Sequence, residues 1–276
     1  MSDSAAARAH LTPLADDVTL AWEDQGAGRP FLLLHGGAGP ASVLPFATLL
    51  ARHGRVITPT HPGFAGRPRP DGLDSIPRLA SVYLDLLRHL DLQDVTVVGN
   101  SIGGWIAAEL ALSDTSRIGR IVLVNAVGIH VAGSDTEIAD IFALPPDQTG
   151  RLAFHNPALR PDPATLTNDE LAAAAANRAT AAVYAGDPYM HDPQLRRRLK
   201  DVDVPVLVAW GKGDGIVTPA YGRAYAESFA AARFELIADA GHFPQIEQPA
   251  RLLALISEFV RHEQGHIGRP SPHDHQ

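Results

Sequence analysis

The sequence predicts an α/β fold in which helices flank a mostly parallel central sheet. Its 276 residues, 45% hydrophobic and 20% charged, can form one such domain or one domain with a smaller inserted part. Residues 95–98 are a β-branched run of the kind found in buried parallel strands. Residues 105–112 are an apolar, alanine-rich run typical of a buried helix. A short strand that leads almost directly into a helix is the main indication of this fold class.

Further apolar runs complete the predicted sheet and its helices. Strands are expected, in chain order, at residues 18–22 as an antiparallel edge, 30–34, 55–59, 95–98, 120–125, 204–210 and 233–237. Helices are expected at residues 76–90, 105–112, 221–229 and 249–261. The small and polar residues 1–9 are expected to fray.

Composition excludes several classes of protein. The chain has no cysteine, so neither a disulfide framework nor a thiolate metal site can form. The formal net charge of −8 argues against nucleic-acid binding, because phosphate recognition favours a basic surface. The sequence has no apolar run of about 18 residues that could span a membrane and no export signal near its start. We therefore expect a cytoplasmic protein without nucleic-acid or membrane partners, whose oligomeric state, a homodimer included, stays open.

A serine lies between the strand at 95–98 and the helix at 105–112. The segment from Gly99 to Gly103 places Ser101 between two glycines, each two residues away. A strand that turns into a helix with almost no loop forces its central residue into a strained conformation and requires small neighbours. The serine oxygen is then pushed out at the end of the sheet. The alternative is a glycine-rich turn in which Ser101 only caps the following helix.

This strand, turn and helix resemble the nucleophile elbow of the α/β-hydrolase superfamily. The resemblance covers the chain from Phe31 to about Arg261 and implies an α/β-hydrolase fold with a serine nucleophile. In that superfamily the chain order is serine, acid, histidine, with the last two on loops after late strands. This order implies the catalytic residues Ser101, Asp214 and His242. Taken singly, Asp214 could be a turn residue and His242 a loop residue held by packing.

A glycine-rich loop follows the first parallel strand. Residues 35–40 read His-Gly-Gly-Ala-Gly-Pro and leave backbone N–H groups free to face a substrate. In α/β-hydrolases this loop lends one amide to the oxyanion hole and the residue after the nucleophile lends the other, which implies Gly37 and Ile102 here. The alternative is a tight turn in which glycines only relieve strain. His35 and His61, the latter at a position where many relatives have aspartate, are expected to be structural.

A long insertion interrupts the predicted sheet. About eighty residues separate the strands at 120–125 and 204–210, far more than a simple crossover needs. α/β-hydrolases carry a cap at this point, and the helical character of residues 135–144 and 168–185, set between prolines, agrees with one. The expected division is a core domain at 10–126 and 201–263, a helical cap at 127–200 and a disordered tail at 264–276.

The resemblance implies hydrolysis of a carboxylic ester, lactone or thioester of a small organic substrate, since serine suits acyl transfer to water. The alternative is carbon–carbon bond hydrolysis of a diketo acid, because Gly-Asn-Ser-Ile-Gly-Gly and His-Gly-Gly look most like meta-cleavage-product hydrolases. That family has asparagine before the nucleophile, as Asn100 is here, but usually tryptophan in place of Phe243 and a longer glycine loop than residues 36–40. Asn100 and Phe243 are therefore expected to bind the substrate.

A cap arginine distinguishes these two activities. In meta-cleavage-product hydrolases such an arginine binds the substrate carboxylate, and Arg178 in the expected helix 168–185 is the candidate here. A guanidinium can hold a carboxylate through two parallel hydrogen bonds. The plain interpretation, favoured by the usual exposure of arginine, is a solvated residue outside the site.

A non-enzymatic alternative is a ligand-binding protein that keeps the pocket and the triad without catalysis. The complete set of expected catalytic residues favours an enzyme. Side chains and backbone amides supply every expected part of the site, so we expect no metal and no cofactor. The expected partner is a small-molecule substrate.

Overall fold

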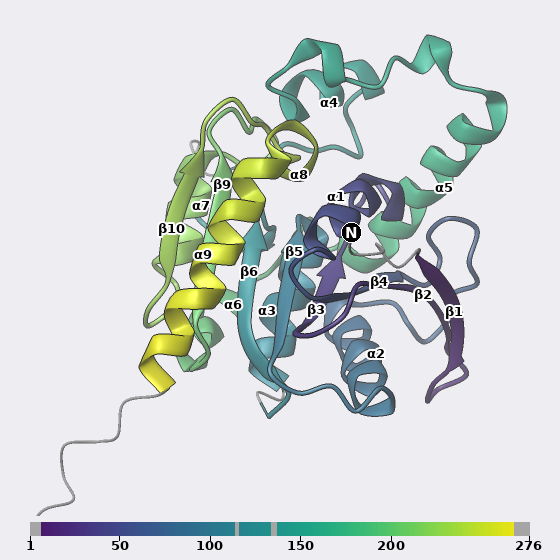
Figure 1. Cartoon of the computed structure of the whole chain (residues 1–276). Coiled ribbons are helices and arrows are strands. Elements are labelled where there is room, and N and C mark those ends of the chain that lie inside the picture. The colour runs from purple at the N-terminus through teal and green to yellow at the C-terminus, as the bar shows by residue number, and fades with distance from the viewer. Residues whose placement is uncertain (1–6, 114–115, 134–136, 268–276) are drawn as a thin grey trace, which may run out of the picture.

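The computed structural model, which describes residues 7–113, 116–133 and 137–267, has one eight-stranded sheet with the order β1-β2-β4-β3-β5-β6-β9-β10 (Figure 1). β2 pairs antiparallel with β1 and with β4, and all other neighbours are parallel. The strands are β1 (Arg8–Pro13), β2 (Thr19–Gln25), β3 (Pro30–Leu34), β4 (Arg55–Thr60), β5 (Val95–Asn100), β6 (Ile118–Val124), β9 (Val206–Gly211) and β10 (Arg233–Ile237). The predicted mostly parallel α/β fold is confirmed.

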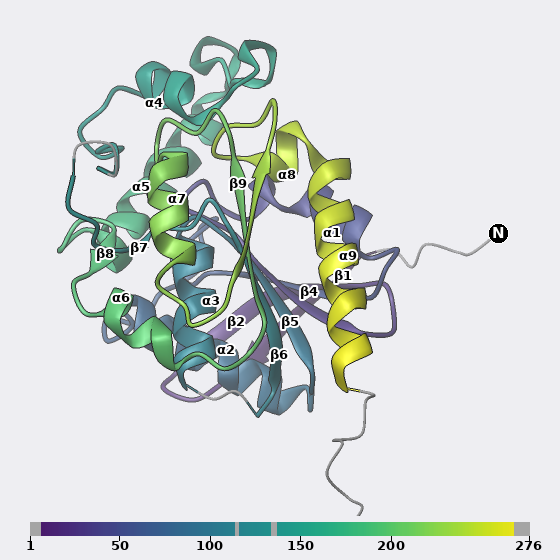
Figure 2. The same ribbon diagram turned by 90° about the vertical axis from the view of Figure 1, so that its left-hand side faces the viewer.

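Helices cover both faces of this sheet (Figure 2). One face carries α2 (Ile76–His89), α3 (Ile102–Ser113) and α7 (Pro219–Ala226). The other carries α1 (Leu44–Leu50) and α9 (Pro249–Ile267). Each group shares its own apolar core with the strands. Burial on both faces explains why the central strands read as continuous apolar runs.

The first two strands differ from the prediction. The run at 18–22 was expected at the edge, but β2 lies between β1 and β4, and β1 forms the edge from Arg8 onward. In β1 only Thr12 is buried, and it accepts a hydrogen bond from Trp22 Nε1 at 2.9 Å. An edge strand with so little buried surface has no alternating apolar pattern to reveal it. The expectation that residues 1–9 fray is wrong for Arg8 and Ala9, which pair with β2, and residues 1–6 lie outside the described part of the chain.

The inserted segment, residues 125–205, joins β6 to β9. It contains α4 (Pro146–Ala153), α5 (Asn168–Ala185), α6 (Leu195–Arg198) and the paired short strands β7 (Gly128–Ile129) and β8 (His191–Asp192). Single turns of 3-10 helix occur at Pro157–Leu159, Pro163–Thr165 and Leu199–Asp201, and a further one precedes α1 at Pro40–Ser42. Figure 1 shows α4 and α5 beyond one end of the sheet. The domain bounds given above, with a cap at 127–200, stay a prediction.

Within this segment one expected helix is present and the other is not. α5 has the predicted bounds, and a reciprocal capping box between Thr167 and Glu170 begins it. The helix expected at 135–144 is wrong for residues 137–144, which form coil and a turn. The Asp140 carboxylate accepts hydrogen bonds from the backbone N–H groups of Phe142 and Ala143, which favours a turn over a helix.

The last helix is longer than predicted. α9 continues to Ile267, so residues 264–267 of the expected disordered tail are helical, and residues 268–276 lie outside the described range. No helix in the described part of the chain is long and apolar enough to cross a membrane.

Candidate active site

The turn between β5 and α3 has the predicted geometry. Ser101 has a φ of 56°, a left-handed conformation that non-glycine residues adopt only under constraint. A Cβ at Gly99 would collide with the carbonyl of Gly103, and a Cβ at Gly103 with the carbonyl of Leu34. Close packing of helix, turn and neighbouring strand therefore requires glycine on both sides of Ser101.

The Ser101 hydroxyl does not cap α3. It forms no hydrogen bond to another group in the described chain, whereas a capping serine would accept one from an N–H of the first turn. Backbone bonds hold the turn, because the Ser101 N–H donates to the Val124 carbonyl at 3.0 Å and the Ser101 carbonyl accepts from the Gly104 N–H at 2.9 Å. The side chain is left to line a cavity, with the residue only 8% exposed.

Asp214 and His242 form a buried pair. His242 Nδ1–H donates to Asp214 Oδ2 at 2.8 Å, and Asn125 Nδ2 donates to the same oxygen at 2.6 Å. The other oxygen, Oδ1, accepts from the backbone N–H groups of Ile216 and Val217 at 2.8 and 3.1 Å. Four donors thus fix the carboxylate and, with Nδ1 carrying hydrogen, a neutral imidazole presents Nε2 as its acceptor.

Two other parts of the chain bond to the backbone of His242. The His242 N–H donates to the Ala153 carbonyl at the end of α4, and the His242 carbonyl accepts from Asn100 Nδ2 at 3.0 Å. Asn100 also donates to the Val124 carbonyl and accepts from Gln245 in α8 (Pro244–Glu247). Asn100 therefore contacts the histidine loop and does not line the cavity, so the expected substrate contact is not observed.

Two backbone N–H groups are available beside the serine. A Cβ at Gly37 would lie 3.7 Å from Ile102 Cδ1, so the glycine loop and the start of α3 are close together. In the described chain neither the Gly37 nor the Ile102 N–H donates to a protein acceptor. The first N–H groups of a helix carry partial positive charge, so Ile102 is suited to face a developing anion.

His35 and His61 form a buried network behind the glycine loop. His35 Nδ1–H donates to the Gly36 carbonyl at 2.7 Å, and its Nε2 accepts from the His61 N–H at 3.0 Å. His61 Nε2–H donates to the His35 carbonyl at 2.8 Å, and its Nδ1 accepts from the Tyr83 hydroxyl. Burial lowers the pKa of His35 to about 4 and the pKa of His61 well below its usual value. Both rings are therefore neutral and structural, as predicted.

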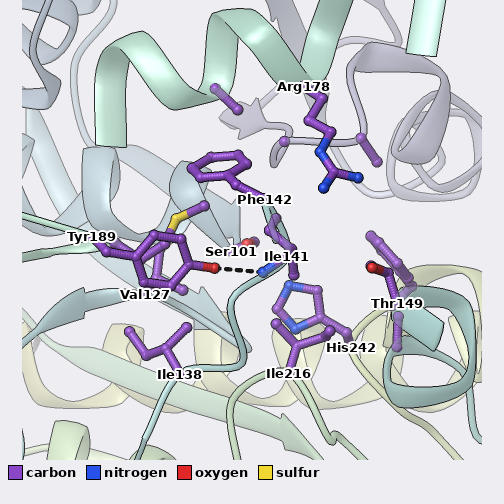
Figure 3. Close-up of a pocket in the computed structure, with 16 residues that line it drawn as sticks. Ser101, Val127, Ile138, Ile141, Phe142, Thr149, Arg178, Tyr189, Ile216 and His242 are labelled. Carbon is purple, nitrogen blue, oxygen red and sulfur yellow. Dashed lines mark hydrogen bonds between the residues drawn. The ribbon is translucent and has the colours of Figure 1, made fainter. Parts of the chain in front are cut away.

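Ser101 and His242 open into one cavity of about 180 Å³ (Figure 3). The expected substrate-binding Phe243 lines it, with its ring edge-on to His242 at 5.2 Å and tilted against Phe154 at 5.1 Å between centroids. Gly37 also lines the cavity. Asp214 and Ile102 do not line it, and Asp214 lies behind His242. No hydrogen bond joins Ser101 to His242 among the described residues, and such catalytic contacts often tighten only when substrate binds.

Comparison with known proteins agrees with this geometry. Residues 31–255 match the family model described as "Alpha/beta hydrolase family". The chain belongs to this alpha/beta hydrolase family. It is therefore a hydrolase, and the predicted fold and enzyme class are confirmed. The same assignment implies a small-molecule substrate.

Curated relatives of this hydrolase include both predicted kinds of enzyme. It is 30% identical to a 2-hydroxymuconate semialdehyde hydrolase of Pseudomonas putida over 86% of this chain and 89% of the relative. It is 31% identical to a pimeloyl-[acyl-carrier protein] methyl ester esterase of Aromatoleum aromaticum over 84% of this chain and 99% of the relative. At these identities the relatives leave the substrate open.

Solved structures share the fold of this hydrolase. A bacterial membrane phospholipase A has a TM-score of 0.79 at 22% identity, covering 93% of this chain and 86% of that chain. A meta-cleavage product hydrolase of Pseudomonas fluorescens, complexed with acetates, has a TM-score of 0.72 at 22% identity, covering 92% and 98%. Likeness at this level of identity supports the architecture alone.

Arg178 lies inside the site of this hydrolase. The favoured interpretation of a solvated surface arginine is wrong, because Arg178 is half-buried and its guanidinium lines the cavity (Figure 3). Arg178 Nη2 donates to the Leu144 carbonyl at 3.1 Å. The structure shows no other protein hydrogen bond or ion pair of this guanidinium in the described chain. Its remaining N–H groups can therefore serve a ligand.

Several site residues were missed by sequence reasoning. Most of the apolar cavity wall comes from the inserted segment, at Val127, Ile138, Ile141, Phe142, Ala153, Ala181, Tyr189 and Met190, with Thr149 as a polar member. These residues have no periodicity or motif that distinguishes them from other apolar positions. Asn125, which holds Asp214, carried a usable signal: it is a polar residue directly after a buried strand, beside the elbow.

The sequence also contains a metal-binding motif that the expectation of no metal does not take into account. Residues 262–266 read His-Glu-Gln-Gly-His, the His-Glu-x-x-His spacing of zinc proteases, which weakens the expectation of a metal-free chain. They lie at the far end of α9, about 25 Å along the helix from its start at Pro249. Side chains are described only up to residue 262, and within that part of the chain no group of three or more His, Asp or Glu could hold a metal ion.

Proposed function

We propose that this hydrolase cleaves a carboxylic ester, lactone or thioester of a small organic molecule, with Ser101 as nucleophile, His242 as general base and Asp214 as its orienting acid. The observation that carries the proposal is that a serine, a histidine and backbone N–H donors lie close together at one cavity. A strained serine and a histidine fixed by a buried carboxylate line that cavity, and the unpaired backbone N–H groups of Gly37 and Ile102 lie close to the serine. Each part matches a requirement of acyl transfer through a covalent intermediate.

In the first half-reaction Ser101 Oγ bonds to the substrate carbonyl carbon while its proton passes to His242 Nε2. The carbonyl oxygen gains negative charge, which the N–H groups of Gly37 and Ile102 stabilise. The bond to the leaving alcohol then breaks, and His242 gives the proton to the departing oxygen. Ser101 is left as an acyl ester.

In the second half-reaction water attacks the acyl carbon and gives its proton to His242. The bond to Ser101 Oγ breaks, the serine regains the proton from His242, and a carboxylic acid leaves. Asp214 keeps Nδ1 protonated throughout, because Oδ2 accepts from it at 2.8 Å. Asn125, Ile216 and Val217 hold that carboxylate in place.

Labelling with an active-site phosphonate tests this assignment. One label per chain, located on Ser101 by mass spectrometry, is expected, together with loss of ester hydrolysis. Ser101→Ala should abolish labelling and lower turnover by about three to six orders of magnitude, as loss of a serine nucleophile does. Ser113→Ala, at the opposite end of α3, is the matched control and should behave as wild type. Labelling elsewhere, or near-normal turnover of Ser101→Ala, contradicts the proposal.

A second candidate is carbon–carbon bond hydrolysis of a diketo acid, and Arg178 is the observation that favours it. Its guanidinium points into the cavity and has N–H groups to spare for a substrate carboxylate. Two relatives are named as 2-hydroxymuconate semialdehyde hydrolase and 2-hydroxy-6-oxo-2,4-heptadienoate hydrolase, the latter 26% identical. The same serine would then act on a ketone carbonyl, and carbon would replace oxygen as the leaving atom.

Arg178→Ala separates the two candidates. With a diketo acid substrate the variant should lose about 2 to 3 kcal/mol of transition-state stabilisation, or roughly 30- to 150-fold in kcat/KM, the range for hydrogen bonds to charged groups. A neutral ester should lose little. Arg151→Ala is the matched control, because Arg151 is exposed and its ion pair in the described part of the chain is with Asp147 on its own helix. Equal small losses for both substrates remove Arg178 from substrate binding and leave ester hydrolysis.

A further inference from the structure

A second hollow lies beside the active-site cavity. Its volume is about 580 Å³, against about 180 Å³ for the cavity that Ser101 and His242 line. Ile138 and Tyr189 line both spaces. These two side chains are therefore a shared wall between the catalytic cavity and the second hollow.

The two spaces differ in chemical character. The catalytic cavity is mainly apolar, with Arg178 and Thr149 as its polar groups away from the serine and histidine. The second hollow combines apolar residues with the imidazoles of His130 and His191, whose ring centroids lie 5.0 Å apart, and with the Glu137 carboxylate. The apolar residues of the second hollow, Ile129, Val131 and Ala132 among them, can bury the far end of an acyl chain that crosses the wall.

Tyr189 fixes the position of this wall. Its hydroxyl donates to the Ala139 carbonyl at 2.7 Å. It also accepts from the Ile141 N–H at 2.8 Å, the bond that Figure 3 draws. Its ring packs edge-on against Phe142 at 5.5 Å between centroids. The Ala139 N–H in turn donates to the Ile216 carbonyl, two residues from Asp214. Tyr189 is thus bonded to residues 139–141 of the same inserted segment, and these residues are bonded to the core.

Burial raises the pKa of Tyr189 to about 12, so the phenol keeps its proton throughout the neutral range and remains a donor to Ala139. Ile138, by contrast, makes only apolar contacts and is half-buried. Of the two wall residues, Ile138 is therefore the one whose side chain can be removed without breaking a hydrogen bond.

We propose that Ile138 and Tyr189 set the length of the acyl group that the cavity accepts, and that the second hollow is an extension of the binding site which takes the far end of longer acyl chains when the wall is opened. This inference rests on the proposed ester hydrolysis. An acyl group larger than the small cavity has to displace the wall, and each methylene left unburied forfeits binding energy in the transition state.

The experiment measures kcat/KM for a series of p-nitrophenyl esters with acyl chains from two to eight carbons. Wild type should favour the short esters. Ile138→Ala should raise the ratio of the eight-carbon to the two-carbon ester at least tenfold, and Ile138→Val should raise it less. Tyr189→Phe, which removes the bonds to Ala139 and Ile141 but little volume, should move the ratio the same way by a smaller factor.

Ile141→Ala is the matched control, because Ile141 lines the catalytic cavity and not the second hollow. It enlarges the cavity without joining the two spaces, so the length ratio should change less than threefold. Equal shifts in Ile138→Ala and Ile141→Ala, or no shift in both Ile138 variants, overturn the proposal. Hydrolysis of the two-carbon ester by the wild type tests the proposed function separately. If the wild type does not hydrolyse this ester, ester hydrolysis itself fails. If it does and the length ratio does not shift in the variants, only the role of the wall fails.

Discussion

In the core, each of the residues Ser101, Asp214 and His242 follows a strand of the sheet directly or after a short loop. The cavity wall opposite them comes from coil, turns and helices of the inserted segment. The core residues are fixed by backbone geometry and by hydrogen bonds to backbone groups. The wall is fixed by side-chain packing and by hydrogen bonds between its side chains and its own backbone, as at Tyr189 and Asp140. Chemistry and selectivity are therefore carried by two regions, of which only the first is built on the strands of the sheet.

The two regions are also joined by specific bonds. The His242 N–H donates to the Ala153 carbonyl of α4. At a second place, Arg198 of α6 makes two hydrogen bonds to the carboxylate of Glu109 in α3, at 2.7 and 3.1 Å, and one to Asp192 at 3.2 Å. Because Glu109 is only 1% exposed, this contact fastens the inserted segment to the helix that begins at the nucleophile.

The largest effect is expected in the core, at Asp214. Asp214→Asn should lower kcat by about 10³- to 10⁴-fold, because an amide cannot hold His242 in the tautomer that leaves Nε2 free. Thermal stability should also fall, because the amide nitrogen of the variant would face N–H donors that now bond to a carboxylate oxygen. Asp239→Asn is the matched control, since Asp239 is an exposed acid on the same loop as His242. A loss of less than tenfold in Asp214→Asn would remove Asp214 from the catalytic set.

An intermediate effect is expected where the two regions meet. Arg198→Ala should lower the free energy of unfolding by about 3 kcal/mol, because it leaves the buried Glu109 carboxylate without its partner. Adding Glu109→Gln should restore part of the loss by removing the unpaired charge. Urea unfolding gives both values, with exposed Arg151→Ala expected to cost under about 0.5 kcal/mol. A cost for Arg198→Ala as small as for Arg151→Ala would contradict the fastening role.

A smaller effect is expected from pH, and it arises in the core. The pKa values of His35 and His61 are lowered in the folded state, so the unfolded chain binds protons first as pH falls below 6.5. For His35 the stabilisation from the neutral ring is complete above pH 6.5 and is lost toward pH 4, by at most about 1.4 kcal/mol per pH unit. The lowered pKa of His61 adds a loss in the same direction. Urea unfolding between pH 7 and pH 5.5 measures this slope.

Two variants calibrate the pH measurement. His61→Gln should flatten the slope, since it removes one of the two buried imidazoles. His53→Gln should leave it unchanged, because His53 is an exposed histidine. Identical slopes for wild type and His61→Gln would show that the buried network does not titrate as its pKa shifts require.

The core was largely predictable from sequence because its constraints are local. Small residues at Gly99 and Gly103 follow from the close approach of helix and strand, and the strand ends before Asp214 and His242 follow from apolar runs. The edge strand β1 was missed because its exposed faces leave no pattern. Asn100 was assigned to the substrate, yet its neighbours in space, His242 and Gln245, are far away in sequence.

The inserted segment was less predictable for a physical reason. Arg178 and the apolar wall line the cavity because α5 (Figure 1) and the coil and turn at 137–144 lie against the catalytic end of the sheet. The turn at Asp140 replaced an expected helix through side-chain bonds to the backbone. The position of these side chains and the turn at Asp140 depend on contacts within the folded chain. The periodicity of a single sequence does not reveal such contacts.

Rapid mixing of the enzyme with a p-nitrophenyl ester tests the central claim most directly, namely that Ser101 forms a covalent acyl intermediate. The account predicts a burst approaching one equivalent of nitrophenol per chain where deacylation is the slower step. Quenching during the burst should place the acyl mass on Ser101. Ser101→Ala should give neither burst nor adduct. An acyl group found on another residue, or rapid hydrolysis by Ser101→Ala, would contradict it.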